Sequence, residues 1–188
     1  MDQEATDRAP ARGAQSSGYA LDDPAFRPDF RIGHVHLRVA DLARATAFYR
    51  DVLGFDVMAY GPDFGLPGAA FLSSRGYHHH VGLNTWESEG ETPPPEGHTG
   101  LYHFALLYPD RRELGRAVRQ ILDRGYPIDS AEDHGATLSV YLKDPDCNGI
   151  ELYCDRPRSK WLDSQGKPVL KADAFDPADG LAGQGIPG

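Results

Sequence analysis

The stretch that decides the fold is residues 32–55, which read IGHVHLRVADLARATAFYRDVLGF. Its first eight residues alternate between apolar and polar side chains, as a half-buried strand should. The apolar side chains are Val35, Leu37 and Val39, and the polar ones are His34, His36 and Arg38. This alternation predicts a strand that packs one face on a core and turns the other toward a cleft.

A helix is predicted directly after this strand. Asp41 is suited to be its N-cap, and Gly54 is suited to end it. Apolar residues recur along one helical face at Leu42, Ala45, Phe48, Tyr49 and Val52. Three further strands are then predicted at residues 55–60, 69–73 and 78–85, which completes a βαβββ module.

The same order of elements occurs a second time after a proline-rich linker at residues 91–97. A strand is predicted at 101–107, and a helix begins at Asp110, where Glu113 predicts a capping box. Gly125 ends this helix, and the strands that follow are predicted near Ile128 and at residues 137–142 and 149–154. Since each module places its helix on one side of a largely antiparallel sheet, the fold class is α+β.

The expected architecture is therefore two βαβββ modules that form a partly open, β-barrel-like cleft with the helices outside. The expected boundaries are a flexible N-terminal arm (1–29), module one (30–90), a linker (91–98), module two (99–157) and a C-terminal tail (158–188). The arm lacks apolar periodicity and is expected to be ordered only near Phe26 and Phe30. The tail carries apolar residues that could pin it to the body: Trp161, Leu162, Val169, Leu170 and Phe175.

Composition limits the partners and the compartment. The formal net charge of −9 argues against binding to nucleic acid or to an anionic membrane surface. The two cysteines, Cys147 and Cys154, are too few for a disulfide framework and suit a reducing compartment. Residues 1–18 have no apolar segment typical of a signal peptide, and no run reaches membrane length. We expect a soluble, cytoplasmic protein.

Three residues point to a metal site. His34 and His103 occupy corresponding places in the opening strands of the two modules, and Glu151 is predicted to face the cleft from the last strand. A buried carboxylate opposite histidines is costly without a compensating cation. Two imidazoles and one carboxylate form the facial triad of non-heme Fe(II) sites. For each histidine alone, a hydrogen-bonded structural role is the alternative.

The remaining histidines divide by position. His78, His79 and His80 follow one another, so that alternation turns at least one toward the cleft, or all three belong to a solvated edge strand. His36 is expected to line the cleft without binding metal, and His98 is expected on the surface.

Three motifs carry a resemblance to a known family: the helix pattern of 32–55, YHFAL at 102–106, and VYLKDPDCNGIELY at 140–153. They resemble the vicinal oxygen chelate superfamily, which includes glyoxalase I, bleomycin-resistance proteins and extradiol dioxygenases. Within it the pattern is most similar to catechol 2,3-dioxygenase-type extradiol enzymes. That resemblance implies metal ligands at His34, His103 and Glu151, an Fe(II) cofactor with Mn(II) as the alternative, and a catechol-type diol and O₂ as substrates.

The same resemblance implies the catalytic residues. His79 matches a non-ligating acid–base histidine, while His134, in a His-Gly motif, and Tyr141, ten residues before Glu151, would hydrogen-bond the diol and the developing oxyanion. The cleavage would fall beside the two hydroxyls. A homodimer is expected, because dimers are common in the superfamily.

Two departures from the family pattern stand out. The interval from His134 to Tyr141 is shorter than usual, and Cys147 replaces a glycine of the turn before Glu151, where φ is often positive. Many extradiol enzymes also have four modules, whereas this chain has two.

Two other function classes fit the same fold. A glyoxalase- or epimerase-type isomerase or lyase would use a fourth ligand, for which His78 or His80 is the candidate. A resistance protein that sequesters a small molecule would not need the triad.

Overall fold

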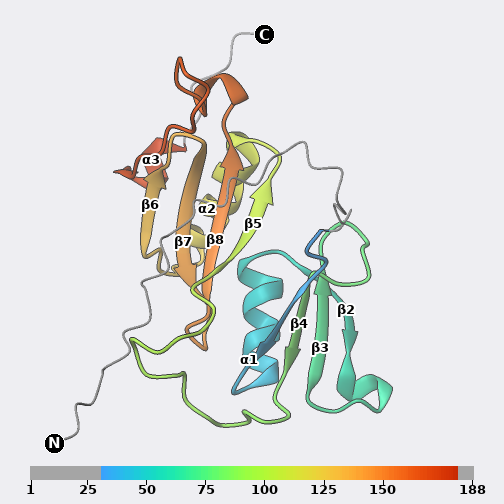
Figure 1. The fold of residues 1–188 in the computed structure, drawn as a ribbon. Coiled ribbons are helices and arrows are strands. Elements are labelled where there is room, and N and C mark those ends of the chain that lie inside the picture. The colour runs from blue at the N-terminus through green and yellow to red at the C-terminus, as the bar shows by residue number, and fades with distance from the viewer. Residues whose placement is uncertain (1–30, 182–188) are drawn as a thin grey trace, which may run out of the picture. The chain divides into compact units, whose positions relative to one another are not determined.

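The fold is seen in a computed structural model that describes residues 31–181. The predicted N-terminal arm, with Phe26 and Phe30, and the last seven residues lie outside the described residues. The elements of module one are β1 (Val35–Arg38), α1 (Leu42–Ala47), η1 (Phe48–Val52), β2 (Asp56–Tyr60), η2 (Gly61–Phe64), β3 (Ala69–Ser73) and β4 (Val81–Asn84). Figure 1 shows α1 beside this sheet.

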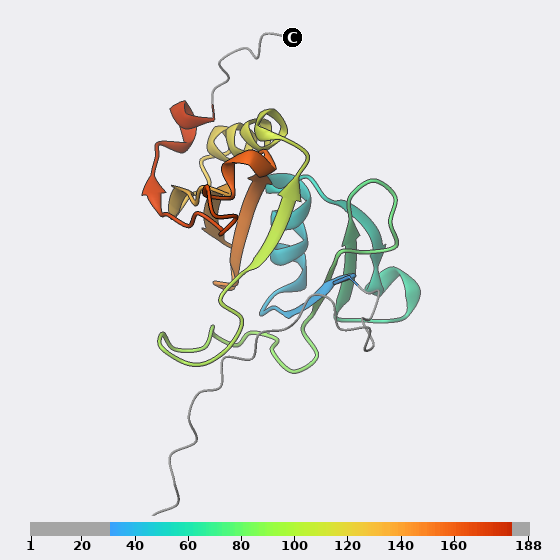
Figure 2. The ribbon, with the colours of Figure 1, turned by 45° about the horizontal axis from the view of Figure 1, so that its top comes forward.

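Module two repeats this order and continues into the tail. Its elements are β5 (Phe104–Tyr108), α2 (Arg111–Asp123), β6 (Ser130–Asp133), β7 (Thr137–Lys143) and β8 (Gly149–Asp155), followed by η3 (Arg158–Lys160), β9 (Asp173–Ala174) and α3 (Pro177–Gly180). In the turned view of Figure 2, the orange-to-red tail runs back along this module, where β9 pairs with β6.

The two sheets have matching topology. Their strand orders are β1-β4-β3-β2 and β5-β8-β7-β6-β9. In each module the first strand pairs in parallel with the last, and the other neighbours are antiparallel. This confirms the predicted α+β class and the internal repeat. The sheets do not close into a barrel.

Local chemistry explains where the helices begin and end. The side chains of Asp41 and Asp110 accept hydrogen bonds from the backbone N–H groups of Arg44 and Glu113, at 3.0 and 2.8 Å, as N-caps do. Gly54 and Gly125 have positive φ just after the helices. Between Phe48 and Val52 the first helix widens into a π-helix, which the sequence did not predict.

Three local predictions are corrected by the structure. The carboxylate of Glu113 accepts from Arg116 at 3.0 Å, so the expected capping box is not completed. The strand predicted at 78–85 begins only at Val81, which leaves the three consecutive histidines in the preceding loop. The strand predicted near Ile128 is Ser130–Asp133.

The core is one cluster of buried side chains drawn from both modules. Leu37, Leu72 and Leu83 contribute from module one, and Leu114 and Leu152 contribute from module two. The alternating burial of β8, with Ile150, Leu152 and Cys154 inside, confirms that Glu151 and Tyr153 face away from α2. Within residues 31–181, no helix has the length and apolarity needed to cross a bilayer.

A buried turn joins the modules. The carboxylate of Asp144 accepts from Tyr49 Oη at 3.0 Å, from Asp146 N and Asn148 N at 2.9 Å each, and from Asn148 Nδ2 at 2.9 Å. Burial, followed by the nearby Asp144 carboxylate, holds the pKa of Tyr49 well above its usual value. The phenol therefore stays a hydrogen-bond donor to the turn that leads into β8.

Cys147 lies in that turn with φ of 64°, the left-handed conformation that its place in the motif predicted. A side chain with Cβ strains there by roughly 1–2 kcal/mol, whereas glycine does not. Cysteine rather than glycine at this position therefore costs stability at the point where β8 begins.

We predict that Cys147→Gly raises the free energy of unfolding by about 1 kcal/mol, because the relief of backbone strain exceeds the added entropy of the unfolded chain. Urea denaturation measures the change. Cys147→Ala is the matched control, since it removes the thiol but keeps Cβ, and it should give no gain. Equal gains in both variants would attribute the effect to the thiol instead.

Candidate functional site

One group of predicted site residues lies at the β5–β8 junction of module two. His103 Nε2 is 3.2 Å from Glu151 Oε2, and their side chains are 30% and 14% exposed. They meet because β5 and β8 run parallel, with Ala105 opposite Glu151. Gly149 permits this approach, since a Cβ there would lie 2.1 Å from the carbonyl oxygen of Tyr102.

Tyr141 extends this group from the neighbouring strand. It is directly opposite Glu151 in the β7–β8 register, and its hydroxyl donates to Glu151 Oε1 at 3.1 Å. Burial, followed by the charge of Glu151, raises the pKa of Tyr141 to about 12. The phenol is therefore protonated near neutral pH and serves as a donor beside the carboxylate.

His134 completes the group from the end of β6. Its Nε2 lies 2.8 Å from Tyr141 Oη, and Glu132 Oε2 lies 3.8 Å from the same nitrogen. The short interval between His134 and Tyr141 therefore does not separate them, because the β6–β7 hairpin folds one over the other. The single hydroxyl proton of Tyr141 faces two acceptors, Glu151 Oε1 and His134 Nε2, so the three residues form a path along which a proton can move.

The other predicted residues gather in module one. The rings of His34 and His79 have centroids 4.5 Å apart, and Phe71 lies 5.1 Å from His79. His78 Nδ1 is 2.8 Å from His79 Nδ1. Burial, followed by the neighbouring His34, lowers the pKa of His79 and also that of His36. These imidazoles are thereby biased toward the neutral form that binds metals and accepts protons.

The remaining histidines have simpler surroundings. His36 lies over Gly82, 6.1 Å from Phe71 and 6.0 Å from Trp86 between ring centroids. His80 Nδ1 is 3.1 Å from Ser73 Oγ and 3.2 Å from the backbone nitrogen of Ser74. His98 is exposed in the linker, as predicted.

Two cavities differ in their relation to these groups. The one of about 490 Å³ is lined by His103, Glu132, Tyr141 and Lys143 among others, and so opens onto the module-two group. The larger one, about 780 Å³, lies beside the start of α1 and contains none of the predicted site residues.

The predicted metal ligands are divided between the two groups. Among residues 31–181, no three or more His, Cys, Asp or Glu side chains lie close enough to hold one metal ion. The structure thus pairs His103 with Glu151 and sets His34 beside His79. The donor types suit Fe(II) or Mn(II), and His103 Nδ1 is buried without a hydrogen-bond partner within the described residues.

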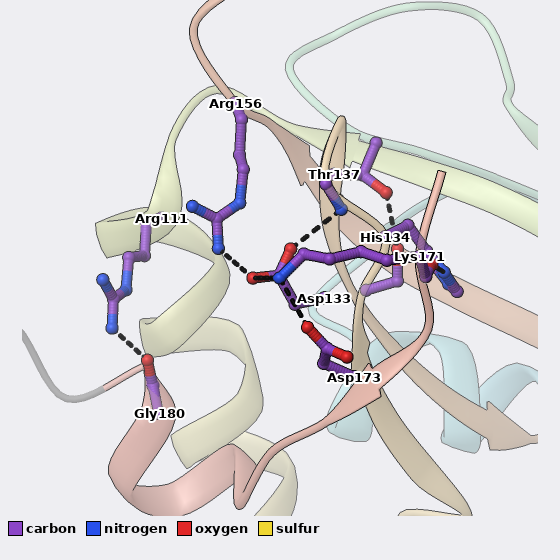
Figure 3. A network of polar contacts seen from close by, with 10 residues as sticks. Arg111, Asp133, His134, Thr137, Arg156, Lys171, Asp173 and Gly180 are labelled. Atoms are coloured by element: carbon purple, nitrogen blue, oxygen red, sulfur yellow. Dashed lines mark hydrogen bonds and ion pairs between the residues drawn. The ribbon is translucent and has the colours of Figure 1, made fainter. Parts of the chain in front are cut away.

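The contacts of Asp133, the residue before His134, were not predicted from the sequence. Asp133 accepts from Arg156, from Lys171 Nζ at 3.0 Å, and from the Gly135 backbone at 2.9 Å. Lys171 also pairs with Asp173 at 2.7 Å. Figure 3 shows Arg156 and Lys171 converging on Asp133 next to His134. A motif search could not find this network, because its members are ordinary charged residues far apart in sequence.

Comparison with known proteins defines the class of this chain. The chain belongs to the Glyoxalase/Bleomycin resistance protein/Dioxygenase superfamily, whose family model matches residues 31–152. It is 40% identical over 150 residues to a catechol-2,3-dioxygenase of Bacillus subtilis, a match covering 79% of this chain and 50% of that protein.

A further relative agrees with this assignment, and a solved structure shares the fold. The chain is 32% identical over 125 residues to a biphenyl-2,3-diol 1,2-dioxygenase of Rhodococcus globerulus, covering 66% of this chain and 63% of that one. It therefore spans about half to two thirds of these relatives' length. A glyoxalase/dioxygenase structure from Nostoc punctiforme matches the fold with a TM-score of 0.57 at 24% identity, over 68% of this chain and 92% of that one.

The Asp133 network makes stability depend on pH. Burial alone would raise the pKa of Asp133, but the Gly135 N–H, Lys171 and Arg156 outweigh it and lower the pKa. A carboxylate with a lowered pKa in the folded state stabilises the fold above its unfolded-state pKa, about 3.9, and this stabilisation is lost as the pH falls through the folded-state pKa.

We predict that Asp133→Asn lowers the free energy of unfolding near neutral pH, and that the difference from the unsubstituted protein shrinks below about pH 4. Urea denaturation of both proteins across this range measures it. Asp63→Asn, an exposed carboxylate in η2, is the control and should change little. A difference that stays constant with pH would refute the assigned role of the charge.

Proposed function

We propose that the chain is an extradiol ring-cleaving dioxygenase that acts on a catechol-type aromatic diol with O₂ at a mononuclear non-heme Fe(II) site. The observation that carries the proposal is the unbroken contact series from His103 through Glu151 and Tyr141 to His134, at 3.2, 3.1 and 2.8 Å. Similarity to enzymes named for catechol and biphenyl-2,3-diol supports it.

Each residue has a role in this proposal. His34, His103 and Glu151 hold the metal, which, when bound, supplies open coordination positions for the diol oxygens and O₂. Tyr141, which lines the cavity, and His134, which contacts Tyr141, hydrogen-bond the diol and carry a proton along their contact. His79, which lies beside His34 in module one, is the acid–base residue.

Oxygen consumption tests this function directly. Protein purified anaerobically should contain one iron per chain or take it up, and should consume O₂ on addition of catechol or a substituted catechol, giving a yellow ring-opened product. His103→Ala should abolish uptake, because it removes a ligand. His98→Ala, an exposed histidine in the linker, is the matched control and should retain activity.

Other outcomes would decide against the proposal. Bound nickel, zinc or cobalt without O₂ uptake would favour an isomerase or lyase of the glyoxalase type. Failure to bind any metal, with tight binding of an aromatic ligand, would favour a sequestering protein.

We further propose that the working form is a homodimer whose metal centre takes His34 from one copy and His103 and Glu151 from the other. The support is the separation of the two groups among residues 31–181, together with their opening to the surface: Tyr102, next to His103, is 90% exposed, and Tyr77, next to the module-one histidines, is 37% exposed. A two-fold axis would create two such centres at once.

Complementation between inactive variants tests this arrangement. His34→Ala and His103→Ala proteins, unfolded and refolded together in equal amounts, should regain about a quarter of the activity, because half of the dimers are mixed and each has one intact centre. Mixing His103→Ala with Glu151→Ala should restore nothing, since each centre would keep one defect. No recovery in the first mixture would show that the centre is built within one chain.

A further inference from the structure

We propose that the C-terminal segment 161–175 is a positioning element of the site, in which the backbone carbonyl of Lys171 holds the His134 ring in the tautomer and orientation that present Nε2 to Tyr141. The catalytic meaning of this contact rests on the proposed function, whereas the contact itself does not. The family model ends at residue 152, so the segment lies outside the matched region.

The tautomer follows from the chemistry of the acceptor. His134 Nδ1 lies 3.0 Å from the carbonyl oxygen of Lys171. A carbonyl oxygen only accepts hydrogen bonds, so Nδ1 must carry the proton. In the neutral ring, Nε2 is then the unprotonated nitrogen, and it faces Tyr141 Oη at 2.8 Å, so the single hydroxyl proton of Tyr141 is shared between His134 Nε2 and Glu151 Oε1. An imidazole whose far nitrogen is held by a carbonyl has both its rotation and its tautomer defined.

The segment is held in place by charge on one side. Lys171 Nζ bridges Asp133 and Asp173, and both carboxylates raise the pKa of its ammonium group, Asp173 more strongly. Because Asp133 directly precedes His134, this bridge ties the carbonyl of Lys171 to the residue that it orients (Figure 3).

Backbone pairing and packing hold the segment beyond Lys171. β9 pairs with β6 by placing Asp173 opposite Asp133, and Phe175 N donates to Ala131 O at 3.0 Å. The ring of Phe175 packs on the core, and Leu181, beyond the end of the segment, is also buried.

The position of the C-terminal segment explains why glycine, and no larger residue, fits at position 135 of the His-Gly motif. Gly135 has φ of 81°, and a Cβ there would lie 2.8 Å from the carbonyl oxygen of Val169. That contact is below the separation at which real Cβ atoms occur. A side chain at position 135 would therefore push the segment, and with it Lys171, away from His134.

Side-chain ¹⁵N NMR of the full-length chain, prepared without metal to avoid paramagnetic broadening, tests the contact. His134→Gln identifies the His134 signals. The unsubstituted protein should show protonated Nδ1 and unprotonated Nε2, with a slowly exchanging Nδ1 proton. Lys171→Ala should lose the slow exchange and mix the tautomers, and Lys171→Arg should restore the original pattern. Lys167→Ala, whose side chain is exposed in the same segment, should change nothing.

Gly135→Ala gives a second, independent perturbation and should reproduce the spectrum of Lys171→Ala. If either variant is unfolded by near-UV circular dichroism, the other decides. A folded variant with an unchanged His134 tautomer and exchange rate would overturn the proposal.

Catalysis gives a separate readout. In the iron-loaded protein, Lys171→Ala should lower kcat about 10- to 100-fold with a smaller change in KM, as the loss of an orienting contact does. If no catechol supports O₂ uptake, the proposed function fails, while the NMR result still decides the positioning role.

Discussion

The buried carboxylate of Asp144 is the interaction on which the rest of the structure depends. It is only 3% exposed, yet each of its oxygens accepts hydrogen bonds, from Tyr49 on the first helix and from the turn around it. Without such partners, the free-energy cost of burying a carboxylate would be too large for the fold to tolerate. Satisfying it sets the geometry of the turn, and the turn sets where β8 begins and therefore where Glu151 lies. The same atoms tie module one to module two.

The arrangement of the site residues follows from where the Asp144 turn places β8, and not from a local sequence motif. The parallel pairing of β5 with β8 brings His103 to Glu151, and the antiparallel β7 adds Tyr141 on the same side. Nothing in the immediate sequence around any one of these residues requires the other two. Their convergence comes from sheet order, which is why the repeat of the module pattern was the decisive clue.

Much of the fold could be predicted because its signals are local. Asp41 and Asp110 cap helices through their own side chains, and Gly54 and Gly125 end them through a backbone conformation that glycine adopts easily. The histidine loop before β4 and the π-helix were missed, since periodicity does not mark where pairing stops. The role of Lys171 was beyond prediction for another reason: it acts through a backbone carbonyl, and every residue has one. The identity of a substrate likewise cannot be read from sequence periodicity, because the cavity lined by Glu132 and Lys143 is shaped by the tertiary fold.

The parallel pairing of the first and last strands also has a consequence for how the chain acquires its fold. Neighbouring antiparallel strands close short loops, but β5 must wait for β8, which is the last strand of its module to be synthesised. Pairings between distant parts of a chain form slowly, since the entropy of closing a long loop is lost before any contact compensates for it. During synthesis on the ribosome, β5 therefore emerges with an unpaired edge that persists until β8 arrives. The contacts of the C-terminal segment form later still. The contact that orients His134 is therefore made only after most of the strands have paired.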